Sequence, residues 1–228
     1  MKAYVITLMN LPESVRLAER CIDSAKKFNI DVEMFRATDR ANAEEERLIN
    51  NIPIGSITDE YADPAACLGC FMSMYRLWEK IASSRQSTII LEHDAVFTDA
   101  LPDYISGDIV NLARPSYGDF NTKQNTGIYS LFSKSGGYFP GSHGYLLTPK
   151  GASKLILAAK QDGAYATDLF LCKQRFKDLK EIYPWIIEAH SEFSTIQNTA
   201  GVQAQHAFRK YTEQGLSYQT AQQIWSNG

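Results

Sequence analysis

The chain has 228 residues, of which 44% are hydrophobic and 21% charged, and its 23 basic and 26 acidic side chains give a net charge of −3. This composition is that of an ordinary globular protein and excludes the collagen, coiled-coil and disordered classes. The sequence has no apolar run close to the roughly 20 residues of a membrane helix. The N-terminus lacks the small-residue cleavage site of a signal peptide. We therefore expect one large domain, located in the cytoplasm.

Short apolar runs alternate with helical patterns along the chain. Strands are predicted at 3–8, 32–36, 87–92, 108–113, 143–147 and 181–187, and helices at 12–28, 43–51, 64–82, 149–160 and from Thr167 onward. Asp63-Pro64 and Thr148-Pro149 each pair a capping residue with proline at the first helical position. The segment 115–142, rich in Gly, Ser, Asn and Pro, predicts a long loop, and Pro184 predicts an edge position for the last strand. The alternation indicates an α/β fold with a mainly parallel sheet flanked by helices.

The carboxyl ends of parallel strands form the edge at which such sheets bind ligands. This places Thr7 and Leu8, residues 36–39, and Glu92-His93-Asp94 at one edge. Two carboxylates on either side of one residue can hold Mn²⁺ or Mg²⁺ against phosphate oxygens. The alternative is a strand end that carries only solvated charges.

The four cysteines are too few for a disulfide framework in a chain of this size. Cys67 and Cys70 have the spacing of half a zinc site, but Cys21 and Cys172 do not supply a second pair. We expect Cys67 and Cys70 to be buried, unreactive thiols on a helix.

Several motifs occur in an order that resembles one enzyme family. They are residues 4–8 with Pro12 and Arg16, Arg36-Ala37-Thr38-Asp39, the 68–78 segment with Gly69-Cys70, Ser73 and Trp78, Leu91-Glu92-His93-Asp94, the 144–152 segment, Thr167-Asp168-Leu169, and Ser194-Thr195-Ile196-Gln197. Together they resemble glycosyltransferase family 25, the lipooligosaccharide galactosyltransferase type, over about residues 3–198. There are two departures, because His93 stands where the family has an Asp and Met74 stands where its helix has a His.

The resemblance implies a GT-A (Rossmann-like) fold and inverting transfer of a hexose from a nucleotide sugar, often a UDP-sugar, to a glycan or glycolipid hydroxyl. It implies a single domain at 1–198, with a donor half at about 1–100 and an acceptor half at about 101–198. Residues 199–228, which contain six Gln, are expected to form a peripheral helix or tail.

The resemblance also suggests roles for particular residues. Glu92 and Asp94 would hold Mn²⁺ or Mg²⁺, with His190 as a third ligand, and Asp168 would be the base that deprotonates the acceptor. His93 would contact the donor ribose or phosphate, or bind the metal through a nitrogen. The donor-binding residues are expected to be Thr7, Leu8, Arg16, Arg36, Ala37, Thr38, Asp39, Ser73 and His93. The alternative for Asp168 is a carboxylate that only favours a helix N-terminus.

Residues 120–161 contain five Lys and no Asp or Glu. With Lys123, Lys134 and His143 on the acceptor side, this predicts an anionic glycan or glycolipid acceptor, and less strongly a nucleic acid. One rival is a transferase that acts on modified nucleic acid bases, although the chain lacks an aromatic-rich basic stripe. The other is a nucleotide-sugar binding module that has lost catalysis, to which His93 and Met74 would point.

Overall fold

The computed structural model describes residues 1–57, 63–116, 119–139 and 142–190. The predicted closing motif at 194–197 and the Gln-rich segment 199–228 lie outside the described residues. The elements in chain order are β1 Lys2–Thr7, α1 Pro12–Lys26, β2 Asp31–Arg36, α2 Ala43–Ile49, α3 Pro64–Ala82, β3 Thr88–Glu92, β4 Ala95–Phe97, β5 Ile109–Asn111, β6 Gly127–Ser130, β7 Gly144–Leu147, α4 Pro149–Asp162, α5 Thr167–Phe170, β8 Lys180–Tyr183 and β9 Ile187–Ala189.

One sheet runs through the described part of the chain in the order β2-β1-β3-β7-β5-β8-β6. The strands that precede the predicted site, β2, β1 and β3, pair in parallel. β7 is antiparallel to both β3 and β5, β5 is parallel to β8, and β6 is antiparallel to β8. The α/β fold is confirmed, and its parallel part carries the ends of β1, β2 and β3 to a common edge.

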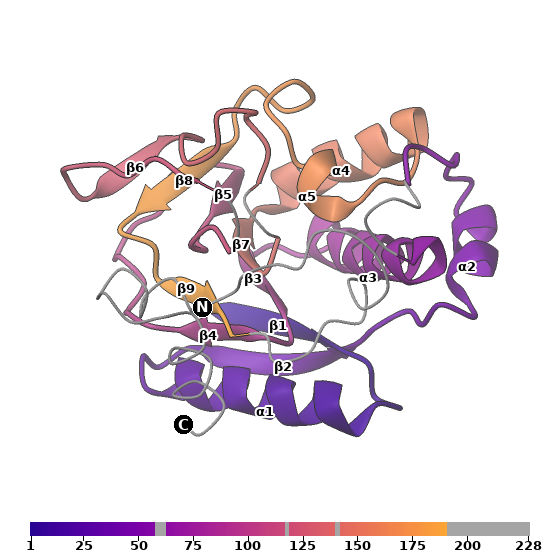
Figure 1. The fold of residues 1–228 in the computed structure, drawn as a ribbon, viewed down its shortest axis with the longest axis horizontal. Helices are drawn as coiled ribbons and strands as arrows, with labels where there is room; N and C mark the ends of the chain where they lie inside the picture. The colour runs from indigo at the N-terminus through magenta and orange to yellow at the C-terminus, as the bar shows by residue number, and fades with distance from the viewer. Residues whose placement is uncertain (58–62, 117–118, 140–141, 191–228) are drawn as a thin grey trace.

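Helices cover both faces of this sheet (Figure 1), and the strand sequences show why. Successive side chains of a strand point to opposite faces. Tyr4 and Ile90 face a core formed with α3, α4 and α5, whereas Val5 and Ile89 face a second core formed with α1. Strands buried on both faces read as continuous apolar runs, as these do.

The longest helix, α3, is anchored by its aromatic face and by its cap. The Asp63 side chain accepts hydrogen bonds from the backbone N–H groups of Ala65 and Ala66, as predicted for a capping residue before proline. Trp78 is fully buried, stacks on Phe170 at a centroid distance of 5.5 Å and donates from Nε1 to the Tyr145 hydroxyl at 2.8 Å. These contacts hold α3 against both the sheet and α5.

Three local predictions are wrong. The segment 115–142 is not all loop, because Gly127–Ser130 forms β6. The predicted strand at 181–187 divides at Pro184 into β8 and β9, and β8 is not an edge strand since β6 pairs with its outer side. Residues 95–97, for which no strand is predicted, form β4 and pair with β9 in a separate small sheet.

A buried carboxylate organises this second half of the sheet. Glu181 is fully buried in β8, and one of its oxygens accepts from Asn111 Nδ2 and Trp185 Nε1, both at 2.9 Å. The other accepts from the backbone N–H groups of Phe132 and Ser133, both at 3.0 Å. One side chain therefore joins β5, β8, the segment after β6 and the segment before β9.

We expect Glu181→Gln to lower the free energy of unfolding by about 2–3 kcal/mol, since an amide NH₂ would face two donors and leave them buried without an acceptor. Urea unfolding measures this change. Glu19→Gln, at an exposed position of α1, is the matched control and should cost almost nothing. Equal losses in the two variants would show that the Glu181 hydrogen bonds do not stabilise the fold.

Candidate active site

A cavity of about 560 Å³ lies at the carboxyl ends of β1, β2 and β3. Its walls come from the segment after β1, the segment after β2, one side of α3 and the end of β3. The lining residues include seven of those predicted from the sequence: Leu8, Ala37, Thr38, Asp39, Ser73, Glu92 and His93. This is the edge at which a parallel sheet binds its ligand.

Two small residues of α3 shape the wall formed by residues 37–41. A Cβ placed on Gly69 would lie 2.9 Å from the Thr38 carbonyl oxygen, so only glycine allows the helix to approach so closely. One turn later, Ser73 Oγ accepts from the Thr38 backbone N–H at 2.9 Å and donates to the Gly69 carbonyl at 2.6 Å. Ser73 thus acts mainly by holding the wall in place.

Asp39 and Arg40 complete that wall. One Asp39 oxygen accepts from the backbone N–H groups of Ala41 and Asn42, at 2.9 and 3.2 Å, which fixes the turn before α2. Arg40 also lines the cavity and pairs with Asp63 at 2.8 Å. Arg40 is not among the predicted donor-binding residues, although it directly follows the Arg36–Asp39 motif.

Carboxylates gather where β3 ends. Glu92 is half-buried, and burial together with the charges of Asp94 and Asp168 raises its pKa to about 8, against a hydrogen bond from Ser142 Oγ at 2.6 Å. Asp94 is buried, and its Oδ1 has no hydrogen-bond partner in the described part of the protein. Such a site favours a cation or a proton.

Asp168 reaches this cluster from α5. Its neighbour Thr167 is buried against α3, with Oγ1 3.9 Å from Cys70 Sγ. Asp168 Oδ1 accepts from the Leu169 backbone N–H at 2.9 Å, and its charge acts on Glu92, Cys67 and Cys70. The structure therefore brings the predicted base to the same carboxylate cluster.

His93 occupies the turn between β3 and β4 and lines the cavity. Its Nδ1 lies 3.1 Å from the hydroxyl of Ser14 on α1. Burial lowers the pKa of His93, which favours the neutral imidazole. The ring is thus held from the α1 side of the sheet.

The three predicted metal ligands are not collected into one set. His190 donates its backbone N–H to the Asp94 carbonyl at 2.8 Å, but its Nε2 lies 3.4 Å from Glu188 Oε2. Among the described residues, no group of three His, Cys, Asp or Glu side chains could hold a metal ion. The His190 ring is directed to Glu188 in this structure, so His190 as a third ligand beside Glu92 and Asp94 stays a prediction.

Three predicted donor contacts do not line the cavity. Arg16 is exposed on α1 and pairs with Glu13 at 2.6 Å, and Arg36 is exposed at the end of β2. The Thr7 hydroxyl is buried and donates to the Val5 carbonyl of its own strand, while the Thr7 carbonyl accepts from the Ala37 N–H. Thr7 therefore does not line the cavity but holds Ala37, which does, through its backbone carbonyl.

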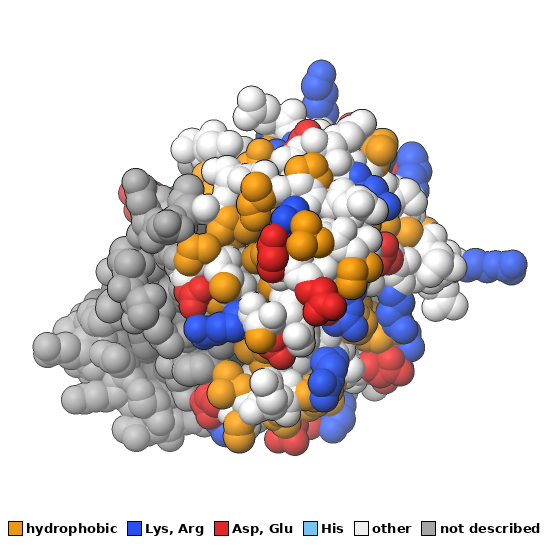
Figure 2. Space-filling view, turned by 90° about the vertical axis from the view of Figure 1, so that its right-hand side faces the viewer, with side chains coloured by type: hydrophobic (Ala, Val, Ile, Leu, Met, Phe, Trp, Pro, Cys, Tyr) orange, Lys and Arg blue, Asp and Glu red, His pale blue; other side chains and the backbone are white. Residues whose placement is uncertain are grey.

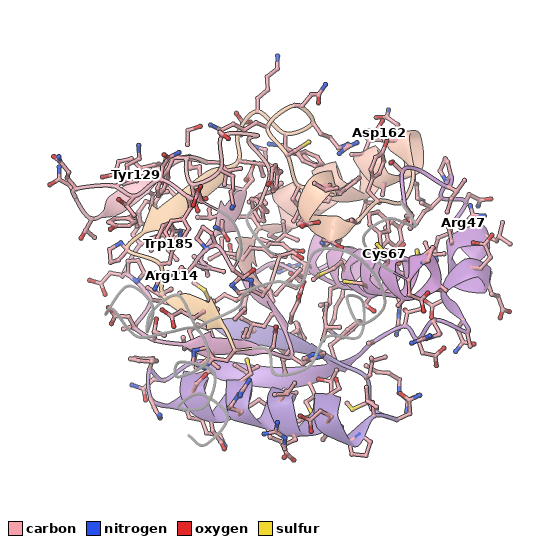
Figure 3. The ribbon with its side chains drawn as sticks, viewed as in Figure 1. Arg47, Cys67, Arg114, Tyr129, Asp162 and Trp185 are labelled. Carbon is pink, nitrogen blue, oxygen red and sulfur yellow. The ribbon has the colours of Figure 1, made fainter. Side chains whose placement is uncertain are left out.

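Of the acceptor-side predictions, Lys123 and Lys134 lie before and after β6 in the chain, whereas His143 directly precedes β7 and lies beside the end of β3. Lys134 is buried and donates from Nζ to the Asp119 carbonyl at 3.0 Å, so it is not a surface charge for an acceptor. His143 is also buried, and its carbonyl accepts from the Glu92 N–H at 3.1 Å. Lys123 is half-buried above the rings of Tyr129 and Phe132, at 5.1 and 4.8 Å from their centroids. In Figure 3, Tyr129, Trp185 and Arg114 lie on this side, away from Cys67 on α3.

Charge on the opposite side is mixed. In Figure 2, which faces the α2 side, Lys and Arg are interspersed with Asp and Glu among the coloured residues. A basic stripe for nucleic acid is not visible among the coloured residues of that face.

Cys70 on α3 lines the cavity and is half-buried, whereas Cys67, one turn earlier, is buried. Burial raises the pKa of Cys67 to about 11 and that of Cys70 well above its usual value, which agrees with the predicted low reactivity.

None of the helices in the described ranges is both long and apolar enough to span a membrane.

Comparisons with known proteins agree with the sequence motifs. A "Glycosyltransferase 25 family member" of Aedes aegypti is 28% identical over 172 residues, covering 67% of this chain and 27% of that protein. The chain thus spans about a quarter of that relative's length. The solved structure of the glycosyltransferase GlyE from Streptococcus pneumoniae TIGR4 is 10% identical, with a TM-score of 0.45, over 99% of this chain and 63% of that one. The family model for glycosyltransferase family 25 (LPS biosynthesis protein) matches residues 1–171, and the chain therefore belongs to this family.

Proposed function

We propose that the protein transfers a hexose from a nucleotide sugar to a hydroxyl group of a glycan or glycolipid, with inversion. The proposed donor is a UDP-sugar. One observation carries this proposal: the cavity at the ends of β1, β2 and β3 is directly bordered by the carboxylate cluster at the end of β3. A cavity of this size matches a small-molecule ligand, and the acidic cluster marks the side at which a diphosphate would need a cation.

Glu92 and Asp94 fit a hard divalent cation such as Mn²⁺ or Mg²⁺. The buried Asp94 Oδ1 lacks a partner among the described residues, and burial together with the neighbouring Asp94 charge raises the pKa of Glu92. Carboxylate oxygens are the ligands such ions prefer, and donor phosphate oxygens would complete the coordination. When bound, the ion would stabilise charge on the departing nucleoside diphosphate as a Lewis acid.

Asp168 is the proposed general base. An inverting displacement requires a proton acceptor on the acceptor hydroxyl, opposite the departing diphosphate. Asp168 reaches the cluster from α5, in the second half of the chain, and not from the β1–β2 wall that would hold the nucleotide. Its position therefore suits the acceptor side.

The proposed acceptor is a sugar of a lipopolysaccharide-type glycan, which agrees with the description of the family. An anionic group on that glycan remains part of the proposal, although Lys134 does not contribute to it. Of the two lysines predicted on the acceptor side, Lys123 and Lys134, the proposal keeps Lys123, whose ammonium group lies over the rings of Tyr129 and Phe132.

The direct test is release of UDP from UDP-glucose and UDP-galactose, with Mn²⁺ present and after chelation. Release that depends on the ion and increases with a glycan acceptor supports the transferase. Binding of the nucleotide sugar without turnover under any condition would favour a binding module that has lost catalysis.

Asp94→Asn should lower the transfer rate at least about 10²-fold, since each tenfold loss corresponds to about 1.4 kcal/mol of transition-state stabilisation and an anionic ligand contributes several. The fold should remain, because the amide has nearly the same shape and relieves the repulsion with Glu92. Initial rates and thermal unfolding measure the two effects. A variant with wild-type turnover would remove Asp94 from the metal site.

The pKa of Glu92, about 8, predicts a pH dependence of stability. The folded state holds a proton that the unfolded chain loses near pH 4.5, so the free energy of unfolding should fall as the pH rises from 5 to 8. The fall should be roughly 2–4 kcal/mol, at about 1.4 kcal/mol per pKa unit. Urea unfolding at several pH values measures the slope, which Glu92→Gln should flatten and the exposed control Glu19→Gln should not. A wild-type slope in Glu92→Gln would contradict the assignment.

Asp168→Asn should lower kcat by about 10²-fold or more, which is the low end for loss of a general base, while KM for the nucleotide sugar stays nearly constant. Steady-state kinetics with each substrate varied in turn separates these values. A comparable rise in KM for the donor would place Asp168 on the donor side instead.

A further inference from the structure

Ser14 links the two sides of the cavity edge. It is the third residue of α1, is fully buried, and has its hydroxyl between the end of β1 and the turn after β3. Its Oγ lies 3.0 Å from the Leu8 backbone nitrogen and 3.1 Å from His93 Nδ1. Both Leu8 and His93 line the cavity.

The direction of these two hydrogen bonds follows from the chemistry of the groups. A backbone N–H can only donate, so Ser14 Oγ accepts from Leu8. The hydroxyl has a single hydrogen, and among the described residues its other partner is His93 Nδ1. If Nδ1 donated instead, the buried hydroxyl hydrogen would have no acceptor, which is costly. The arrangement that uses every group has Ser14 donating to Nδ1.

We propose that Ser14 is a positioning residue that fixes His93 in the tautomer with hydrogen on Nε2, and that Nε2–H donates to a phosphate or ribose oxygen of the nucleotide sugar. The ligand in this inference rests on the proposed function. The tautomer does not, because it follows from the contacts of Ser14 alone.

The environment of Nε2 agrees with this role. The described residues provide no hydrogen-bond partner for Nε2, and the atom is not among the buried polar atoms that lack one. Nε2 is therefore not fully buried, and it belongs to a side chain that lines the cavity. An ionised carboxylate only accepts, and burial and the neighbouring charges raise the pKa of Glu92, so the proton on Glu92 is lost when a cation binds there. The His93 Nε2–H is a donor that does not depend on the protonation of Glu92.

A protonated Nε2 has no lone pair for a metal ion. Of the two roles considered for His93, the arrangement therefore selects contact with the donor substrate over coordination of the metal. It also explains why α1, on the far face of the sheet from α3, contributes to the site.

The tautomer can be measured directly by NMR with ¹⁵N-labelled histidine. The chain has four histidines, so loss of one signal set in His93→Ala assigns His93. In the wild type we expect an unprotonated Nδ1 and a protonated Nε2. Ser14→Ala should shift the ring toward a mixture of tautomers, whereas Ser24→Ala should not. Ser24 is a matched control because it is buried on the same helix but bonds to Phe97 N–H and the Cys21 carbonyl. Protonation of Nδ1 in the wild type, or an unchanged ring in Ser14→Ala, would overturn the proposal.

The ligand contact is tested by calorimetric titration with UDP and Mg²⁺. Ser14→Ala should weaken UDP binding about 3–10-fold, the range expected for one net hydrogen bond. The same substitution should have no effect in the His93→Ala background. An equal loss in both backgrounds would overturn the contact between His93 and the nucleotide. Absence of UDP binding to the wild type would reject the donor in the proposed function and this contact with it, while the tautomer is still decided by NMR.

Discussion

The site depends on two carboxylates, Glu92 and Asp94, whose backbone is held by hydrogen bonds at both ends of the turn after β3. β3 lies between β1 and β7, and its apolar residues Ile89, Ile90 and Leu91 are fully buried. The turn that follows is tied down at each end, since Glu92 N–H donates to the His143 carbonyl and the Asp94 carbonyl accepts from the His190 N–H. These two backbone hydrogen bonds keep the two carboxylate-bearing residues close together. A bound proton or cation lowers the energy of their like charges.

The two cores of the sheet contribute different parts of this site. The α3 core supplies Gly69 and Ser73, which bring residues 37–41 against the helix, and also α5 with Asp168. The α1 core supplies Ser14, which reaches His93 from the other face. The cavity forms where the ends of the strands leave a gap between these layers. Changes in either core can therefore move the proposed site residues without touching a ligand.

Local patterns were sufficient for the parallel half of the fold, because apolar runs, caps and prolines act within a few residues. The same patterns placed Leu8, residues 37–39 and 92–93 at the cavity, and the family resemblance added Ser73. They could not distinguish Arg36 from Arg40, since the two lie four residues apart and only the turn capped by Asp39 decides which one faces the cavity. The small β4–β9 sheet and the Glu181 hydrogen bonds join residues far apart in the sequence, so local patterns could not predict them. The same holds for the His190 ring, because its partner Glu188 lies in β9.

The two departures from the family motifs are related in space. Met74 and His93 line the same cavity, one from α3 and the other from the turn after β3. Met74 accepts from the Tyr145 hydroxyl, which in turn accepts from Trp78, so its thioether fits a buried network anchored in the α3 core. The side of the cavity formed by α3 therefore carries a thioether at Met74, and the side formed by the turn after β3 carries the imidazole of His93. A third carboxylate at position 93 would add charge beside Glu92, whose pKa burial and the Asp94 charge already raise. A neutral imidazole there adds a hydrogen-bond donor instead, so the exchange lowers the charge of the cluster while retaining an imidazole in the cavity.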